Sequence, residues 1–295
     1  MHTYLKLLED VYSRGAIREG RNARTWSVFG RTLSYDLQDG FPILTTKKMA
    51  FRAITAELIG FLRGYRNADD FSRLGCNVWH ANANDPKWKN SAAYQGEGDL
   101  GRIYGVQWRE WRTHTPVLRD PEDSDGPYLI DGYQPFDQIA ELCRLIREEP
   151  TSRRMVVSAW NPGELGEMCL PPCHVLFQVY CDGPYMDLQM YQRSADVFLG
   201  LPFNITSYAL LLWILARSHG YVPRRLHMAL GDVHLYEQHI DQLYTQIGRA
   251  PRPRPELYYN IDVPLGHIQP WDFQPNLFEL IGYDPHPKID AEMIV

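Results

Sequence analysis

The sequence contains few of the features that mark a membrane, secreted or nucleic-acid-binding protein. No stretch approaches the roughly 20 consecutive apolar residues of a membrane-spanning helix. The first residues, Met1–Lys6, lack the basic-then-apolar order of a signal peptide. The net charge is −6, from 30 Lys and Arg against 36 Asp and Glu, so the sequence lacks the basic excess of a broad nucleic-acid-binding surface. We therefore expect a cytoplasmic protein that binds neither membranes nor nucleic acids, with room for a small basic pocket that binds one phosphate.

Cysteine is also scarce. The chain has five cysteines in 295 residues, without zinc-type spacing: Cys76, Cys143, Cys169, Cys173 and Cys181. An odd number with no pairing pattern predicts free thiols in a reducing compartment. Cys173 and His174 are neighbours, but no second Cys/His pair at metal-ligand spacing accompanies them. We therefore predict no metal site.

What remains is the composition of an ordinary globular protein, 44% hydrophobic and 22% charged, without repeats or a linker. Apolar periodicity predicts helices at 2–14, 47–63, 68–75, 136–149, 206–218 and 234–247. It predicts strands at 26–36, 155–160, 174–180, 185–192 and 224–230.

Thr45 and Thr46 are expected to cap the second helix, and 76–109 is loop-rich. Because strands alternate with helices and hairpin signals also occur, we expect one α+β domain over 1–295, with a mixed sheet flanked by helices. Residues 110–135 are expected to form an exposed excursion.

Cys173 follows two prolines and opens a predicted strand, which would fix its sulfur at a sheet end. A lone cysteine is usually a small buried apolar residue, but nearby cations would lower the pKa of this thiol and make it a nucleophile. Glu57 lies within the apolar pattern of helix 47–63. It is either at the solvent edge of that helix or buried with a raised pKa, which would suit it to proton transfer.

Several polar residues could together bind a nucleotide. Arg153-Arg154 and Arg193-Ser194 flank predicted strands, and guanidinium forks match phosphate oxygens. Asn204 offers one donor and one acceptor to a base such as uracil. His234 and Tyr236 could contact a sugar hydroxyl. The basic segment 15–25, with Arg18, Arg21 and Arg24, is either a solvated loop or an anion clamp.

Three blocks carry a family resemblance: Leu170–His174, Tyr191–Asn204 and Gly231–Tyr236. They closely resemble the thymidylate synthase family, and the match runs from Phe29-Gly30 to the last residue. The resemblance implies an α+β fold that dimerises through its sheet. It also implies reductive methylation of dUMP by the co-substrate 5,10-methylenetetrahydrofolate, without a metal.

The resemblance assigns roles at the pyrimidine ring. Cys173 would attack C6, and Asn204 would hydrogen-bond the uracil edge. Glu57 would manage proton transfer at O4 and release of the folate through ordered water. Tyr104 would help to remove the C5 proton by way of water, and His174 would belong to the polar network near O4.

The resemblance also implies how the rest of the substrates would be bound. Arg21, Arg193 and Ser194 would bind the phosphate, with Arg153 and Arg154 reaching across from a second subunit. His234 and Tyr236 would hold the sugar 3′-hydroxyl. The positions that match the folate side are Lys47, Val78, Trp79, Leu170, Asp196, Gly200, Phe203 and Val295, and Asp196 is also expected to serve the substrate.

The sequence departs from the family pattern at three places. The phosphate loop at 21–25 is one residue short, so either Arg21 or Arg24 is the expected ligand. His80 stands where the family usually has an acidic residue, and Ile294 where it usually has a small one.

These departures keep alternatives open. One is a dUMP 5-hydroxymethylase of the viral type, which adds water in place of hydride and would act in the host cytoplasm. A dCMP-directed enzyme is disfavoured because that branch tends to carry Asp at the position of Asn204. A non-catalytic nucleotide-binding or RNA-binding homodimer is disfavoured because it would not need the thiol.

Overall fold

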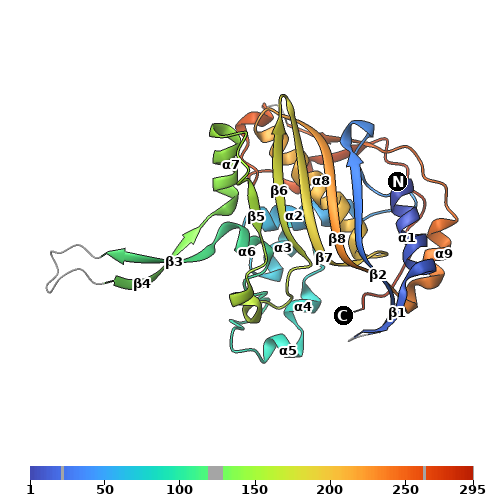
Figure 1. The fold of residues 1–295 in the computed structure, drawn as a ribbon, viewed down its shortest axis with the longest axis horizontal. Helices are drawn as coiled ribbons and strands as arrows, with labels where there is room; N and C mark the ends of the chain where they lie inside the picture. Colours follow the sequence, from blue (N-terminus) through green and yellow to red (C-terminus); the bar gives the residue numbers. More distant parts are fainter. Residues whose placement is uncertain (21–22, 119–128, 262–263, 295) are drawn as a thin grey trace.

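The computed structural model describes residues 1–20, 23–118, 129–261 and 264–294. Its centre is a six-stranded sheet (Figure 1). In spatial order the strands are β1 (Ala16–Glu19), β2 (Arg24–Asp36), β8 (Val222–Tyr236), β7 (Tyr185–Asp196), β6 (His174–Asp182) and β5 (Val156–Ser158). β7 and β8 are parallel, and every other neighbouring pair is antiparallel. The mixed sheet confirms the predicted α+β class.

The two faces of the sheet differ because side chains alternate along each strand. On β7 the buried set is Met186, Leu188 and Met190, and the exposed set is Tyr185, Gln189 and Tyr191. The same alternation on β6 buries Phe177 and Val179 and leaves Gln178 and Tyr180 exposed. The sheet therefore has an apolar inner face and an outer face rich in amide and tyrosine side chains.

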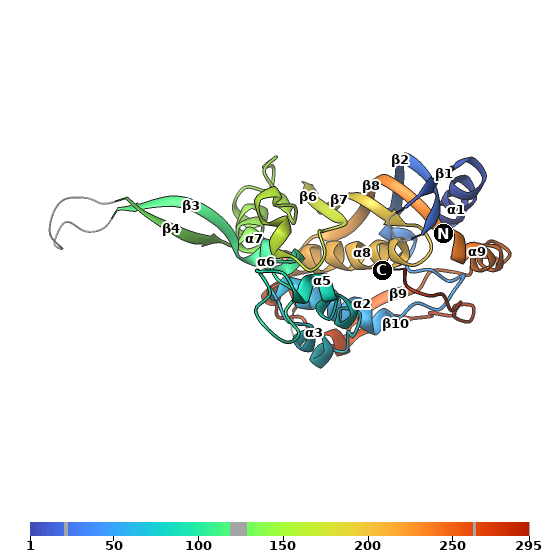
Figure 2. The same cartoon turned by 90° about the horizontal axis from the view of Figure 1, so that it is seen from below.

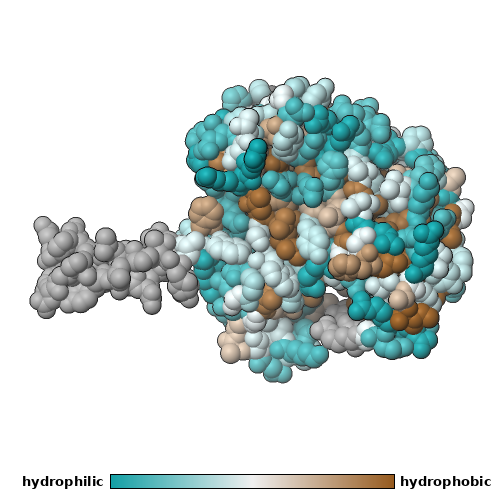
Figure 3. All heavy atoms as spheres, viewed as in Figure 1, coloured by the Kyte–Doolittle hydropathy of each residue, from teal (hydrophilic) through white to brown (hydrophobic). Residues whose placement is uncertain are grey.

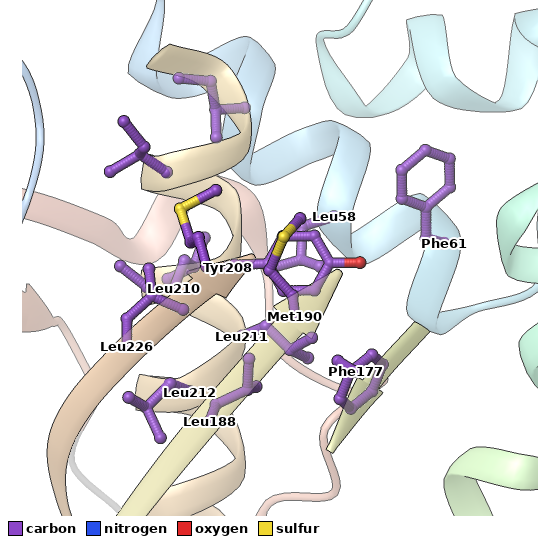
Figure 4. Packing of buried hydrophobic residues seen from close by; sticks show 14 of the residues in the cluster. Leu58, Phe61, Phe177, Leu188, Met190, Tyr208, Leu210, Leu211, Leu212 and Leu226 are labelled. Atoms are coloured by element: carbon purple, nitrogen blue, oxygen red, sulfur yellow. The ribbon is translucent and has the colours of Figure 1, made fainter. Parts of the chain in front are cut away.

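Helix α8 (Gly200–Ser218) packs against the inner face, on β7 and β8. Helix α2 (Phe51–Leu62) packs on the other side of α8, so sheet, α8 and α2 form successive layers (Figure 2). Figure 4 shows Met190, Tyr208 and Leu58 from these three layers gathered in one apolar cluster. Each leucine that is fully buried there stabilises the fold by about 1.5–3 kcal/mol. α2 and α8 are thereby held rigidly relative to the sheet.

Smaller elements surround this core. The remaining helices are α1 (His2–Arg14), α3 (Ala68–Leu74), α4 (His80–Ala83), α5 (Pro86–Lys89), α6 (Tyr104–Arg109), α7 (Gln138–Glu148) and α9 (Ile240–Ile247). Short 3-10 turns are η1 (Leu37–Asp39), η2 (Pro162–Glu167), η3 (Glu237–His239), η4 (Leu265–His267) and η5 (Pro275–Leu277). Strands β9 (Glu256–Tyr259) and β10 (Phe278–Ile281) form a separate pair. Within the described ranges, no helix has the length and apolarity needed to cross a bilayer.

The segment expected to be an exposed excursion contains strands β3 (Trp111–Leu118) and β4 (Leu129–Phe136). They pair with each other and extend away from the rest of the molecule as a two-stranded ribbon (Figure 1). The excursion begins within one residue of the predicted position. Its residues 119–128 lie outside the described part of the chain.

Several predicted element boundaries are wrong. Helix α2 begins at Phe51 rather than 47, and neither threonine caps it. Thr45 Oγ1 instead donates to the backbone oxygen of Arg252, and Thr46 Oγ1 accepts from Gln246. The two threonines are fully buried, so these long-range bonds replace the local cap.

Other boundary errors also arise from tertiary packing. The predicted helix 234–247 is strand up to Tyr236, because β8 pairs with β2 from Arg225 to Tyr236, and α9 begins only at Ile240. The predicted basic loop 15–25 holds β1 and the start of β2. Helix α8 starts six residues earlier than predicted, and the loop-rich region 76–109 contains the short helices α4, α5 and α6.

Candidate active site

Cys173 lies immediately before β6, where two other segments hold it. Its backbone N–H donates to the hydroxyl of Tyr104 at 2.7 Å. Its carbonyl accepts from the backbone N–H of Arg193 at 2.8 Å. The Arg193 guanidinium donates to the carbonyl oxygens of Pro172 and Pro171 at 2.8 and 3.1 Å. The two prolines and Arg193 together fix the turn that presents the sulfur.

The expected lowering of the thiol's pKa is wrong for the isolated chain. Burial raises the pKa of Cys173 above its ordinary value, while the Arg193 charge and a hydrogen bond with Tyr104 oppose that rise. Arg193 therefore acts in the predicted direction, but desolvation outweighs it. The balance between burial and the Arg193 charge therefore sets the pKa of this thiol.

His174 is not paired with the thiol as a base. Its Nδ1 is hydrogen-bonded to the hydroxyl of Tyr208 at 2.8 Å, and its ring stacks on Tyr104 with centroids 4.1 Å apart. Burial lowers the pKa of His174 to about 3, so the imidazole is neutral at physiological pH. His174 is thus held by a hydrogen bond to Tyr208 and by stacking on Tyr104, and it carries no charge.

Glu57 is partly buried on α2, between the two positions that the sequence left open. Burial raises the pKa of its carboxyl group to about 7. The indole N–H of Trp79 opposes the rise, although Nε1 of this buried ring does not reach full hydrogen-bond geometry with an acceptor among the described residues. A carboxyl group with a pKa near 7 can both donate and accept a proton at neutral pH.

Asn204 lies in the first turn of α8 with its amide oriented by Gln192. Gln192 Nε2 donates to Asn204 Oδ1 at 3.0 Å and to the backbone oxygen of Ser194 at 3.0 Å. Among the described residues, Asn204 Nδ2 has no hydrogen-bond acceptor. The amide thus offers a donor on Nδ2 and a second lone pair on Oδ1, which is the complement of a uracil edge.

A polar cavity of about 500 Å³ lies beside Arg193 and Ser194, and its lining includes Arg18, His234 and Tyr236. The predicted phosphate and sugar residues on β7 and β8 are therefore brought together. Arg18, which the sequence placed only within a general basic segment, lies in the same cavity.

Asp232 organises one wall of this cavity. Its Oδ1 accepts from the Ser27 hydroxyl at 2.8 Å and contacts His234 Nδ1 at 3.3 Å, and its Oδ2 accepts from Arg18 at 2.9 Å. These partners hold the pKa of Asp232 below its usual value, His234 foremost. A proton on His234 Nδ1, directed at Asp232, leaves Nε2 to meet a ligand. Sequence reasoning gave Asp232 no role, although it lies within the Gly231–Tyr236 block.

Neither candidate phosphate ligand in segment 21–25 is seen among the described residues that line the cavity. Arg21 lies outside the described residues. Arg24 forms ion pairs with Glu19 at 2.9 Å and with Glu237 at 3.6 Å, and it is not part of the cavity lining. The structure therefore does not support Arg24 as the alternative ligand.

The chain does not bring Arg153 and Arg154 to the other phosphate residues. Both are exposed, and within the described ranges neither forms a salt bridge. Arg154 lines a different cavity of about 250 Å³, next to Phe136 and Val156.

The predicted folate-side residues lie at the start of α8 and around α2. Asp196 Oδ1 accepts from the backbone N–H groups of Phe198 and Leu199, which leaves Oδ2 available. Lys47 is buried: its Nζ donates to the Phe198 carbonyl at 2.6 Å, and burial lowers its pKa to about 8. Gly200 begins α8.

The other folate-side positions are apolar. Trp79 packs edge-on to Phe61 and Tyr104, with centroids 6.0 Å apart in each pair. Three more are partly buried against the core: Val78, Leu170 and Phe203. Val295 lies outside the described residues.

The structure shows the contact of one sequence departure, His80, and how the chain is held near another, Ile294. His80 Nε2 is hydrogen-bonded to the Ser72 hydroxyl at 2.7 Å, so the imidazole is directed to α3. The end of the chain is held by His239, whose Nε2 contacts the Glu292 carbonyl at 2.8 Å. In the described part of the chain, no group of three His, Cys, Asp or Glu side chains could hold a metal ion.

Comparison with known proteins finds one family that matches almost the whole chain. Residues 2–295 match the family model described as Thymidylate synthase. Thymidylate synthases of Pseudomonas syringae pv. tomato and Pseudomonas putida are 40% and 39% identical to the chain, and each alignment covers all of both chains. Thymidylate synthase 1/2 of Encephalitozoon cuniculi is 41% identical over 99% of this chain and 96% of its own.

Proposed function

Because the chain belongs to the thymidylate synthase family, we propose which of its residues carry out the reductive methylation of dUMP to dTMP. The protein is a one-carbon transferase, and 5,10-methylenetetrahydrofolate is its co-substrate. The observation that carries the residue assignments is that Tyr104 on α6 and Arg193 on β7 both hold the turn at Cys173 by hydrogen bonds, while Gln192, next to Arg193, orients Asn204 on α8. We assign the catalytic domain to the whole chain, 1–295.

The first step is attack by the Cys173 sulfur on C6 of the pyrimidine. The new S–C6 bond forms as the C5–C6 π pair shifts, leaving an enolate with negative charge on O4 and nucleophilic character at C5. Asn204 Nδ2 donates to O4, and its Oδ1 accepts from the N3–H group. Because Gln192 already fixes the amide, little reorganisation is needed when this charge develops.

Proton transfer near O4 is assigned to Glu57. With a pKa of about 7, its carboxyl group can deliver a proton as charge builds on O4 and take it back afterwards. Neutral His174, hydrogen-bonded to Tyr208 and stacked on Tyr104, adds to the polar network near O4 without adding charge. Tyr104, which already contacts the Cys173 backbone, lies where it can assist removal of the C5 proton through water.

The dUMP phosphate is assigned to the cavity beside Arg193 and Ser194, whose lining also includes Arg18. Arg21 is assigned to the same phosphate from the family pattern. His234 and Tyr236 bind the sugar 3′-hydroxyl, and Asp232 orients the imidazole. Arg193, assigned to this phosphate, is also the cation that opposes the rise in the pKa of Cys173, so the phosphate site and the nucleophile share one residue.

The folate is assigned to the side of α2 and the α8 start. Asp196 Oδ2 accepts from polar hydrogens of the folate ring, while Trp79 and the apolar positions supply flat contact area. The remaining assignments on this side are Lys47, Val78, Leu170, Gly200, Phe203 and Val295. The folate supplies the one-carbon unit and the hydride, so exclusion of water by these apolar groups protects the reaction.

We propose that the functional unit is a cytoplasmic homodimer formed through the outer face of the sheet. That face exposes large side chains, including Val156 at 43%, Tyr180 at 62% and Tyr191 at 37%. Figure 3 shows hydrophobic patches among the hydrophilic side chains on the same side of the molecule. Such a face supports a symmetric interface. Exposed Arg153 and Arg154 would then supply the second subunit's phosphate site with the positive charge that Cys173 needs.

Product analysis tests this function. Purified protein incubated with dUMP and 5,10-methylenetetrahydrofolate should form dTMP and dihydrofolate in equal amounts, measured by mass spectrometry and absorbance. Formation of 5-hydroxymethyl-dUMP with release of tetrahydrofolate would instead establish the hydroxymethylase. As the matched control, Cys173→Ala should abolish turnover and keep dUMP binding; near-normal turnover in that variant would rule out the covalent mechanism.

A further inference from the structure

A buried ion pair lies behind the catalytic turn. Arg102 is only 2% exposed, and its Nε donates to Glu164 Oε2 at 2.6 Å. The same oxygen accepts from Gln107 Nε2 at 2.7 Å, and the guanidinium also donates to the Glu110 carbonyl. Two opposite charges are thus desolvated together and bonded on several sides.

The ion pair lies where two chain segments are joined through their backbones. The Cys169 N–H donates to the Leu100 carbonyl at 3.0 Å, and the Arg102 N–H donates to the Glu167 carbonyl at 2.8 Å. Gly101 permits this approach, since a Cβ there would lie 2.0 Å from the Glu167 oxygen. One of these segments leads within two residues to Tyr104, and the other within four residues to Cys173.

The same two segments meet again at the reacting groups, where Cys173 N–H donates to the Tyr104 hydroxyl. Segments 100–104 and 164–173 are therefore joined at both ends, by a hydrogen bond at the nucleophile and by the ion pair behind it. We call these two joined segments the frame. Arg112, the second residue of β3, extends the frame by contacting Glu167 at 2.8 Å and Glu164 at 3.5 Å. A shift of Glu164 would be passed to Cys173 along a chain of only nine residues.

We propose that Arg102 and Glu164 are positioning residues that set the geometry of Cys173 relative to Tyr104, and so the rate of attack on the pyrimidine. The inference deepens the proposed function and rests on it. Neither side chain needs to touch the substrate. A displacement of about 1 Å between reacting groups can cost about 100-fold in rate, so a rigid frame behind the turn has a direct kinetic consequence.

A positioning role of the ion pair and a contribution to stability should respond differently to an apolar replacement. A buried ion pair can often be replaced by apolar side chains of similar volume without loss of stability, because the desolvation cost disappears with the charges. The directed hydrogen bonds to Gln107 and the Glu110 carbonyl cannot be reproduced by apolar groups. A stability-neutral replacement should therefore still impair catalysis.

The test compares three variants with the wild type. The double variant Arg102→Met/Glu164→Leu removes both charges, and Glu164→Gln keeps the shape but not the charge. The control Asp10→Asn breaks a partly buried ion pair with Arg31, 2.7 Å long, on α1 and β2. Each protein is measured for thermal midpoint, kcat per titrated active site, dUMP dissociation constant, and amide hydrogen exchange of peptides covering 100–104 and 169–174.

In the double variant we expect kcat to fall about tenfold or more, the dUMP dissociation constant to stay within about threefold, and both peptides to exchange faster. Glu164→Gln should show the same split, which keeps the test decisive if the double variant does not fold. The control should change neither kcat nor exchange of these peptides. A kcat within about twofold of wild type, or a kcat loss shared by the control, would overturn the proposal. If wild-type protein makes no dTMP, the proposed function fails, and the exchange measurement still decides whether the ion pair orders the two segments.

Discussion

At the scale of single residues, Glu57 is the clearest case of environment setting chemistry. Its pKa of about 7 results from burial on α2, where desolvation penalises the charged form. The carboxyl group is therefore costly to the fold when it is ionised and useful to the reaction because it is half-protonated near neutral pH. These two consequences can be measured separately in one variant.

Glu57→Gln should lower kcat by about 100-fold or more and remove an inflection near neutral pH from the kcat profile. Its effect on stability has the opposite sign. The folded-state pKa is raised, so the folded state holds the proton more strongly, and wild-type stability falls as pH rises from about 4.5 towards and above 7. Urea unfolding should show the variant gaining up to about 3 kcal/mol relative to wild type between pH 5 and pH 8. A pH-independent difference would contradict the burial of this carboxyl group.

Arg18 and Arg24 provide a matched pair for the phosphate site. Both are arginines of the same basic segment, but only Arg18 lines the cavity with Arg193 and Ser194. Arg18→Ala should raise the KM for dUMP about tenfold, because it removes a charge-assisted contact, whereas Arg24→Ala should change it by less than about twofold.

Binding of deoxyuridine, which lacks the phosphate, distinguishes a phosphate contact from a distortion of the cavity. Arg18→Ala should leave nucleoside binding unchanged. Equal KM values for the two arginine variants, or an equal loss of nucleoside binding, would remove Arg18 from the site.

At the scale of elements, α2 is held by close packing as well as by burial. A Cβ placed on Gly60 would lie 2.3 Å from a ring carbon of Phe71 on α3. Gly60→Ala should therefore destabilise the protein by about 1–3 kcal/mol, since the clash outweighs the better helix propensity of alanine. Chemical denaturation provides the measurement. Gly166→Ala is the control because nothing lies within 4 Å of its added carbon; equal effects would show that α2 and α3 can separate without cost.

Sequence patterns predicted the elements whose packing is local. The apolar periodicity located α1, α7 and the β6–β7 hairpin to within a few residues, because each buries one regular face. The end of β8 was missed since Gly231 and Asp232 look like a turn, and only pairing with β2 extends the strand to Tyr236. The cap of α2 was missed for a similar reason, because the buried threonines bond to residues about 200 positions away.

The site residues also divide into those that local motifs predict and those whose chemistry depends on distant contacts. Short motifs identified Cys173, Arg193 and Asn204, which lie just before β6, on β7 and on α8. Motifs could not reveal that desolvation of Cys173 exceeds the effect of Arg193, nor that His80 is directed to Ser72. Both depend on distances between segments that are remote in sequence.

At the scale of the whole molecule, the raised pKa of Cys173 and the isolation of Arg153 and Arg154 have one explanation. The chain supplies Cys173 with the charge of Arg193, which does not outweigh burial, and it exposes two arginines that have no salt-bridge partner in the part described. A symmetric dimer through the outer face of the sheet would let each chain complete the other's site. The two subunits would then be catalytically dependent on each other.

Mixed dimers test this dependence. Cys173→Ala and Arg153→Ala/Arg154→Ala proteins should each be nearly inactive alone, the first for lack of a nucleophile and the second for lack of phosphate contacts. If the arginines act across the interface, a mixed dimer contains one site with an intact cysteine from one chain and intact arginines from the other. Random re-pairing makes half of the dimers mixed, so dTMP formation should return to about a quarter of the wild-type rate. Mixing without recovery, while sedimentation shows that subunits have exchanged, would place the arginines in the same chain's site or outside catalysis. A monomeric wild-type protein would exclude the shared site directly, since each chain would then have to activate Cys173 with its own cations.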